Sequence, residues 1–356
     1  MKPFKNLRIV ELASVLAGPS VGLFFAELGA KVIKIENKLT RGDVTRSWKL
    51  STEDSSENTS AYFYSVNRFK KHLFLDFFSQ KDMQVCINEI AKADVVICNF
   101  KKGDDIKFKL DFNSLKKIQP SIIYASINGF GEDSDRAAYD LILQAESGFM
   151  SINGEKNSLP LKMPVALIDL LAGHQLKEAI LIALLEKEKK KKAKKITVSL
   201  FDAAIASLVN QATNYLIANT QPKQQGSIHP NIAPYGEIFK TKDKQLITFA
   251  LGTDKQFFSL LQLLNLENTI KLTIYKTNQL RVKNRKYIEV KLQEAISKIN
   301  FESIYNNCLS RNIPIGKIRS IKEALELNES QHMIISSNEN GKKIKSVKSI
   351  AFKFFN

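Results

Sequence analysis

The chain has 356 residues, of which 44% are hydrophobic and 25% are charged, and its formal net charge is +17 at pH 7. This length allows two hydrophobic cores, and the composition is typical of a soluble globular protein and excludes a disordered or fibrous one. The basic balance raises the hypothesis of nucleic-acid binding, but no recognised nucleic-acid motif with interleaved aromatic residues is found. The run Lys187–Lys195 follows an apolar helix pattern, and we interpret it as a solvated turn.

Apolar segments and cysteines bear on the cellular compartment. No apolar run approaches the roughly 18 residues that a membrane span needs, and Met1–Asn6 leads into a strand pattern with nothing resembling a signal peptide. We therefore expect a cytoplasmic protein with no membrane partner. Cys86, Cys98 and Cys308 have neither metal nor redox spacing, so we expect inert thiols and no metal site.

The first forty residues have the pattern of a β-α-β unit. Leu7–Leu12 and Lys31–Glu36 are short apolar strand patterns, and Val21–Leu28 between them is a helix pattern that stops at Gly29. Such units build parallel sheets that are covered by helices. The first turn reads SVLAGPS rather than G-x-G-x-x-G, so NAD binding is not favoured.

Three further strands are predicted, at Asp94–Cys98, Ile122–Ile127 and Ile196–Leu200, with helical stretches between them. The fold class that this order predicts is α/β, a Rossmann-like, doubly wound, open parallel sheet. Ligands of such sheets bind beyond the carboxyl ends of the strands. Those ends carry Val15–Gly18, Asn99–Gly103 and Asn128–Tyr139.

A second domain is predicted after a helix at Phe201–Ala218. Residues 221–235 are polar and contain prolines, so they look like a linker. Beyond them, a strand at 245–250, helices at 255–264 and 287–299 and a short strand near 317–320 predict a smaller α+β domain. We therefore expect a large domain over 1–220, a linker and small domain over 221–327, and a C-terminal segment 328–356 that returns towards the large domain.

The segment Pro160–Leu185 places a single carboxylate at the start of a long helix. From Leu170 onward, large apolar residues mostly recur three or four apart, which is the period of a helix that buries one face. Asp169 is therefore predicted at the N-cap, where its oxygen accepts backbone hydrogen bonds and the positive helix end favours the ionised form. From this stretch alone, Asp169 is either a structural cap or a reactive group.

About ten sequence blocks occur in an order that resembles one known family. These blocks are LRIVELASVLAGP, ELGAKVIKIE, GDVTR, NRFKKHLFLD, ADVVICNF, SINGFG, AYD, QAESGFMSINGE, MPVALIDLLAG and APYGEIFKTKDK. Together they cover most of the chain and resemble the family III CoA-transferases, the formyl-CoA and carnitine CoA-transferase group of CaiB/BaiF type. The resemblance implies a large domain that binds CoA, a small domain, and a homodimer whose two subunits interlock like links of a chain.

The resemblance also implies a set of site residues. It makes Asp169 the catalytic nucleophile, in the P-x-x-x-x-D-x-x-A-G setting of Pro164–Gly173. The family often has an arginine directly after KIE, where this chain has Asn37, and Arg41 is the candidate substitute. Cations, backbone N–H groups and an apolar wall suit the phosphates and adenine of CoA. The implied CoA contacts are Val15, Leu16, Ala17, Arg41, Leu75, Asn99, Phe100, Lys101, Lys107, Arg136, Ala137 and Tyr139.

The function that the resemblance implies is the transfer of CoA from an acyl-CoA donor to a small carboxylic acid through a covalent aspartyl intermediate. The same family includes 2-methylacyl-CoA racemases, so a racemase is the first alternative. Racemases have a histidine before the aspartate of the AYD block, where this chain has Tyr139, a poor base with a reference pKa of about 10. His174 is the other candidate base for a racemase. A remote alternative, resting on charge alone, is a non-catalytic nucleotide- or nucleic-acid-binding protein.

Overall fold

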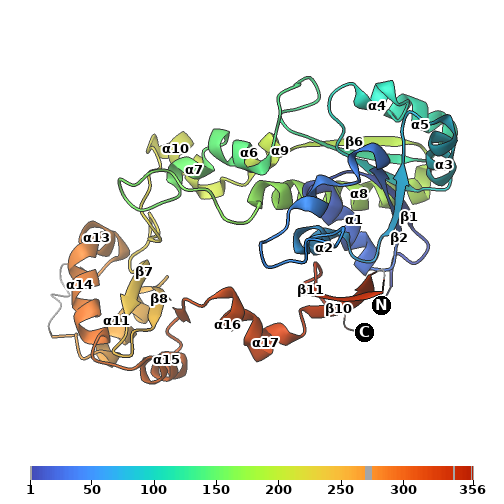
Figure 1. Cartoon of the computed structure of the whole chain (residues 1–356). Coiled ribbons are helices and arrows are strands. Elements are labelled where there is room, and N and C mark those ends of the chain that lie inside the picture. The colour runs from blue at the N-terminus through green and yellow to red at the C-terminus, as the bar shows by residue number, and fades with distance from the viewer. Residues whose placement is uncertain (1, 269–274, 340, 354, 356) are drawn as a thin grey trace. The chain divides into compact units, whose positions relative to one another are not determined.

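The computed structural model describes residues 2–268, 275–339, 341–353 and 355 and consists of two compact units (Figure 1). The first unit comprises Met1–Phe149, Lys162–Thr220 and Asn328–Asn356, and the second comprises Met150–Leu161 and Gln221–Leu327. Within the described residues, every helix is too short or too polar to span a bilayer.

A parallel sheet of six strands forms the centre of the first unit (Figure 1). Its spatial order is β3-β2-β1-β4-β5-β6, and every neighbouring pair is parallel. The order reverses direction between β1 and β4, as in doubly wound folds, so the predicted α/β class is confirmed. The strands are β1 (Arg8–Leu12), β2 (Lys31–Asn37), β3 (Lys71–Leu75), β4 (Val95–Cys98), β5 (Ile123–Asn128) and β6 (Lys194–Ser199).

Helices connect these strands. The longest is α8 (Leu167–Lys190), and α1 (Ala17–Glu27) follows the first strand. The other helical elements before residue 220 are η1 (Lys38–Thr40), η2 (Val44–Ser47), α2 (Ala61–Asn67), α3 (Gln80–Ile90), α4 (Asp104–Lys107), α5 (Phe112–Ile118), α6 (Asp140–Glu146), α7 (Phe149–Ile152), α9 (Leu200–Ala206) and α10 (Val209–Ala218).

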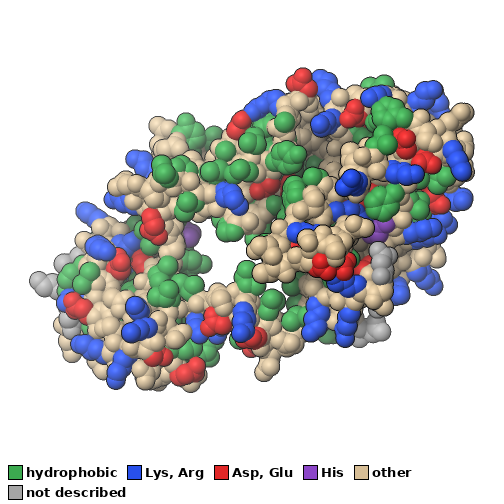
Figure 2. Space-filling model, viewed as in Figure 1, with side chains coloured by type: hydrophobic (Ala, Val, Ile, Leu, Met, Phe, Trp, Pro, Cys, Tyr) green, Lys and Arg blue, Asp and Glu red, His purple; other side chains and the backbone are tan. Residues whose placement is uncertain are grey.

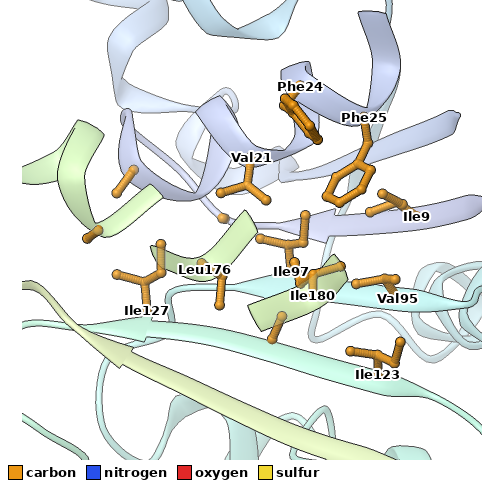
Figure 3. Packing of buried hydrophobic residues seen from close by; sticks show 14 of the residues in the cluster. Ile9, Val21, Phe24, Phe25, Val95, Ile97, Ile123, Ile127, Leu176 and Ile180 are labelled. Carbon is orange, nitrogen blue, oxygen red and sulfur yellow. The ribbon is translucent and has the colours of Figure 1, made fainter. Parts of the chain in front are cut away.

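Both faces of the sheet are buried, which explains the apolar runs in its central strands β1, β4 and β5. On one face, Ile97 and its neighbours pack against Val21 and Phe25 of α1 and Leu176 and Ile180 of α8 (Figure 3). On the other face a separate core contains side chains of β1, β2, β4, α3 and α5. The first face therefore binds the two helices that begin at the carboxyl edge of the sheet.

The crossing of α1 and α8 is unusually close at Gly173. A Cβ atom at this position would lie 2.5 Å from Ser20 Oγ and 3.2 Å from Ala17 O. Both distances are shorter than ordinary van der Waals contact, so the two backbones meet only because residue 173 is a glycine. Asp169 is one turn of α8 away from this contact.

The second unit has its own three-stranded antiparallel sheet, in the order β7-β8-β9, and its own apolar core. It is smaller than the first unit and mixes strands with helices, so the expectation of a small α+β domain is confirmed. Its elements are β7 (Tyr235–Lys240), β8 (Leu246–Ala250), α11 (Asp254–Leu263), α13 (Asn278–Lys283), α14 (Arg285–Ile296), α15 (Phe301–Ser310), β9 (Ile315–Lys317) and α16 (Ile321–Glu326).

The C-terminal segment packs on the first unit. After α17 (Asn328–Gln331) it forms an antiparallel hairpin of β10 (Ile334–Glu339) and β11 (Lys342–Val347). The fully buried Arg68 donates from Nη2 to Val347 O at 2.9 Å and to Glu27 Oε1 at 2.8 Å. The Ser349 N–H and hydroxyl also donate to the carboxylate of Glu27. The ion pair between Arg68 and Glu27 therefore holds β11 and Ser349 on the rest of the first unit.

Two local predictions are wrong. Only residues 191–193 of the lysine run form a connection, because α8 continues to Lys190 and the last lysines belong to β6. Lysine, glutamate and alanine favour helix, and Lys187 Nζ is held 2.9 Å from Asp94 Oδ1. The helix predicted over Phe201–Ala218 is broken at residues 207–208 into α9 and α10. The face in Figure 2 shows Lys and Arg side chains dispersed over both units with acidic side chains among them.

Candidate active site

Asp169 lies in the first turn of α8, three residues after the N-cap. The N-cap is Ala166, so the prediction that Asp169 caps the helix is wrong. The cap is supplied from α6 instead, because Asp140 Oδ1 accepts from the N–H of Ile168 at 2.7 Å and of Asp169 at 3.4 Å. Since the helix already has an acceptor for its free N–H groups, the carboxylate of Asp169 is not needed as a cap.

The carboxyl group of Asp169 is almost completely buried, with 7% of the residue exposed. Burial, followed by repulsion from the charge of Asp140, raises the pKa of Asp169 from 3.8 to about 7. The helix end, which favours the ionised form, does not decide this pKa, because desolvation outweighs it. A carboxylate with this pKa is a stronger nucleophile than an ordinary one, and about half of it is ionised near pH 7.

Tyr62 of α2 is a further residue of this site that the sequence reasoning missed. Burial, and then the charges of Asp169, Asp140 and Asp43, raise the pKa of Tyr62 to about 12. Its ring packs edge-on against Trp48, with the ring centroids 5.1 Å apart. The phenol therefore stays protonated near the two carboxylates and can donate a hydrogen bond. The only local sign in the sequence is an aromatic cluster, AYFY, which is equally typical of a core helix.

The first turn of the sheet, between β1 and α1, contains Val15, Leu16 and Ala17. Asn99, directly after β4, holds this turn through two bonds: its Oδ1 accepts from the Ser14 N–H at 3.0 Å and its Nδ2 donates to Ser14 O at 2.9 Å. Ser20 is the first residue of α1 whose N–H bonds back along the helix, to Leu16 O. The N–H groups before it lie at the positive end of α1, which suits an anion.

The loop after β4 combines aromatic and cationic side chains. Phe100 is partly buried against the core, and Lys101 is exposed. Lys107, at the end of α4, has its Nζ 5.0 Å from the ring centroid of Phe78 and 5.3 Å from that of Phe108. Phe78 is 66% exposed, so an apolar ring and a cation stand together on the surface. This combination suits a planar base with a phosphate group beside it.

The loop between β5 and α6 carries the next candidates. The guanidinium of Arg136 stacks 3.8 Å from the ring centroid of Phe130 and pairs with Glu146. Ala137 is exposed, and Tyr139 is 58% exposed. This loop and the preceding one touch, because Lys102 Nζ donates to Asp133 O at 2.5 Å. The structure thus brings the loops after β4 and β5 together at one edge of the sheet.

Two of the predicted CoA contacts, Leu75 and Arg41, lie outside the loops described above. Leu75 ends β3 with its side chain in the apolar core, 7% exposed, so only its backbone faces the carboxyl edge. Arg41 is exposed in a left-handed conformation at the end of η1. His174, the alternative base of a racemase, is exposed on α8, and partial desolvation of its ring lowers its pKa. No group of three His, Cys, Asp or Glu side chains with metal-binding geometry occurs among the described residues.

Comparisons with known proteins agree with this architecture. Succinate--glutarate CoA-transferase of Agrobacterium fabrum is 37% identical over 327 residues, covering 90% of this chain and 81% of that protein. Succinyl-CoA:glutarate CoA-transferase of Mus musculus is 36% identical over 342 residues, covering 93% and 76%. The crystal structure of a CaiB/BaiF family protein from Brucella suis is 34% identical, with a TM-score of 0.86 over 99% of this chain and 93% of that one. Because the profile of CoA-transferase family III also matches residues 4–354, the chain belongs to that family.

Proposed function

We propose that the protein transfers CoA from an acyl-CoA donor to a small carboxylic acid, with Asp169 as the covalent nucleophile. The observation that carries this proposal is a nearly buried carboxylate with its pKa raised to about 7, in the first turn of α8. The N–H groups at this helix end already have Asp140 as their acceptor, so a capping role does not account for Asp169.

The reaction divides into four exchanges at the same carboxyl group. The Asp169 carboxylate attacks the donor thioester and releases CoA thiolate, which leaves an aspartyl-acyl mixed anhydride. The thiolate attacks the aspartyl carbonyl, which releases the donor acid and gives an aspartyl-CoA thioester. The acceptor carboxylate attacks the aspartyl carbonyl of this thioester, which releases CoA thiolate again and leaves a second mixed anhydride. The thiolate then attacks its acyl carbonyl, which yields the new acyl-CoA and restores Asp169. Holding first the donor acyl group and then CoA covalently on Asp169 splits one difficult exchange into easier steps.

Tyr62 is the candidate donor to the oxyanions of these steps. Each attack converts a carbonyl oxygen into an oxyanion, which a fixed hydrogen-bond donor stabilises. With a pKa of about 12, the phenol keeps its proton throughout the neutral range. The charge of Asp169 contributes to raising this pKa.

The edge of the sheet offers the groups that CoA needs. The start of α1 supplies backbone N–H groups for an anion, Lys107 with Phe78 supplies a cation beside an aromatic face, and Arg136 supplies a second cation. Asn99 holds the first turn rather than pointing freely at a ligand. Val15, Leu16, Ala17, Phe100, Lys101, Ala137 and Tyr139 lie on the same loops at this edge.

The substrate class that we propose is a pair of short dicarboxylic acids. The two relatives named above at 36% and 37% identity are named for succinate or succinyl-CoA and glutarate. Acids of this kind carry a second carboxylate, which distinguishes them from monocarboxylic acyl groups. A panel of acyl-CoA donors and free acids, with thioester products identified by mass spectrometry, tests this choice directly.

The test of the reaction itself is capture of the aspartyl intermediate. The parent protein, given acyl-CoA alone, is expected to accumulate an adduct at Asp169 that hydroxylamine or borohydride intercepts. A racemase would instead exchange the proton next to the thioester carbonyl with deuterated solvent and form no adduct. A protein that only binds nucleic acid would hold a short duplex tightly at physiological salt and do neither.

We also propose that the protein is an interlocked homodimer. Several large apolar side chains of the first unit are exposed around α10, including Val209 at 68%, Leu216 at 78% and Ile217 at 82%. A monomer that exposes such side chains together tends to associate. We propose that a second copy of the chain covers this surface, as the family resemblance implies.

A further inference from the structure

A buried network of charges lies directly behind the first turn of the sheet. Its four members, Glu11, Lys34, Asp43 and Lys70, are each at most 6% exposed. Lys34 Nζ lies 3.0 Å from Glu11 Oε1 and 3.0 Å from Asp43 Oδ2, and Lys70 Nζ lies 2.8 Å from Glu11 Oε2. None of the reaction steps above uses these groups.

Asp43 connects this network to the turn. Its two carboxylate oxygens lie 3.3 and 3.2 Å from the N–H of Val15, and Oδ1 also accepts from the Thr45 N–H at 3.0 Å and the Thr45 hydroxyl at 2.8 Å. On its other side Asp43 is paired with Lys34. Both oxygens therefore face donors only, which is an environment that suits a carboxylate and not an amide.

The conformation of Val15 needs such a partner. Its φ is +71°, a left-handed conformation that a β-branched residue rarely adopts because its side chain crowds the backbone. Backbone strain of this kind persists only where the surroundings impose it, and it is concentrated at ligand-binding sites. Here Asn99 bonds to Ser14 and Asp43 bonds to Val15, so side chains from two other segments hold two adjacent residues of the turn.

The same network favours the protonated, charged form of Lys34. Burial alone would lower the pKa of Lys34, but Glu11, Asp43 and Glu36 raise it above the usual value. Lys34 also donates to Ala13 O at 2.6 Å, two residues before the strained position. The ammonium group thus joins the end of β1 to the carboxylate that holds the turn.

We propose that Asp43 is a positioning residue for CoA binding: through the N–H of Val15 it holds the Ser14–Ala17 turn in the strained conformation that presents the start of α1 to the ligand. This inference rests on the proposed function, because it takes CoA as the ligand of that turn. Asp43 touches neither the thioester nor the nucleophile, so its removal changes the binding of CoA more than the chemical step.

The main experiment measures the dissociation constant of CoA by calorimetry for the parent and for D43N. The amide keeps one acceptor oxygen, so either Val15 or Lys34 loses its partner. We expect CoA to bind about tenfold more weakly or worse. At saturating acyl-CoA, kcat is expected to fall by no more than about threefold, because uniform binding is lost while the reacting groups are unchanged.

The matched control is E27Q. Glu27 is also a buried carboxylate of the first unit, 6% exposed as a side chain and paired with the buried Arg68, but it lies at the far end of α1. E27Q is expected to lower the melting temperature as D43N does and to leave the dissociation constant of CoA within about twofold. If both variants weaken CoA binding equally, Asp43 acts through general stability and the inference is overturned.

The strain itself is tested by adding V15G to D43N. Glycine adopts a φ of +71° without crowding, so the double variant needs the carboxylate less and is expected to recover part of the lost affinity. No recovery would overturn the strain argument. If D43N does not fold, the isosteric T45V, which removes one donor to Asp43, is expected to weaken CoA binding about threefold, and unchanged binding in T45V counts against the proposal.

These outcomes separate the inference from the function on which it rests. A parent protein that does not bind CoA contradicts the proposed function. A parent that binds CoA, together with a folded D43N that binds it equally well, contradicts only the role of Asp43.

Discussion

At the scale of single residues, the carboxyl group of Asp169 combines burial with a nearby like charge. An amide cannot act as the nucleophile in place of a carboxylate, but asparagine has the same shape as aspartate and can keep the packing at residue 169. We expect D169N to lose CoA-transferase activity by about a thousandfold or more. Its free energy of unfolding should stay within about 1 kcal/mol of the parent near pH 4, where the folded parent holds Asp169 in its neutral form. Steady-state kinetics and denaturant unfolding measure the two effects, and near-parental activity would return Asp169 to a structural role.

The pH dependence of the reaction follows from the same carboxyl group. With a pKa of about 7, Asp169 becomes ionised as pH rises, so kcat/KM for acyl-CoA should rise with pH and level off above about 7. D140N removes the charge that helps to raise this pKa, and its amide oxygen can still accept from Ile168. We expect the acid limb of its profile to shift to lower pH. An unchanged limb in D140N would mean that another group controls the profile.

The free energy of unfolding should depend on pH in the opposite sense to the activity: the contribution of Asp169 should decrease as pH rises. The pKa of Asp169 is raised on folding, from 3.8 to about 7, so the folded state binds the proton more tightly. This contribution is fully present below about pH 4 and is lost as pH rises through about 7, and it amounts to a few kcal/mol in order of magnitude. Unfolding of D169N between pH 4 and 8 should therefore be less pH-dependent than that of the parent.

Part of the candidate site was predictable from the residues, and part was not. The AYD and LIDLLAG blocks identify Asp140 and Asp169, but nothing in the sequence indicates that the carboxylate of Asp140 caps α8 from 29 positions away. The groups that influence Tyr62 and the turn that Asp43 bonds to lie in segments distant in sequence from these two residues. Raised pKa values also come from burial, which depends on the complete fold and has no local pattern.

At the scale of elements, the crossing of α1 and α8 offers a sharp test. G173A adds a Cβ atom 2.5 Å from Ser20 Oγ and 3.2 Å from Ala17 O, so α8 must move away from α1. We expect a loss of about 1–3 kcal/mol in unfolding free energy, although alanine favours helix more than glycine does. Because Asp169 is one turn away, kcat should fall as well. Q175A, at an exposed position of the same helix, is the control and should change neither.

The loop after β4 is tested by K107A. If the cation beside Phe78 binds a phosphate of CoA, its loss should raise KM for acyl-CoA several-fold with a smaller effect on kcat, because the contact is the same in the ground and transition states. K109A removes a neighbouring exposed lysine and serves as the control. Equal kinetics of K107A and the parent would exclude Lys107 from the CoA site.

The strands of the central sheet were more predictable than the connections. Five of its six strands are apolar runs with clear boundaries, but β3 reads KHLFL within a basic stretch and was not predicted. It lies at the edge of the sheet, where polar side chains face solvent and weaken the apolar signal. β7 follows a proline-containing stretch that looks like a linker, and its pairing with the antiparallel strand β8 is a tertiary contact that the local sequence does not show.

At the scale of the whole molecule, the exposed apolar surface of α10 predicts the assembly. If the subunits interlock, they cannot separate without local unfolding, so the dimer should persist on dilution in sedimentation experiments. A monomer fraction that increases as the protein is diluted would contradict interlocking. L216D places a charge on this surface and should lower the recovery of dimer after unfolding and refolding, while K223A, on an exposed part of the chain after α10, should not.

The division of the first unit into three chain segments has a consequence for synthesis. Arg68 is completely buried, and its acceptors are Glu27 and the carbonyl of Val347, 279 positions later. While the ribosome is still making the second unit, the central sheet is already available, but this guanidinium lacks its second acceptor and the surface under the last hairpin is uncovered. We therefore expect nascent chains stalled at residue 327 to be cleaved readily near Arg68. Once the last residues leave the ribosome, β10 and β11 should cover Arg68 and end this susceptibility. The second unit can therefore finish folding before the N-terminal part of the first unit does.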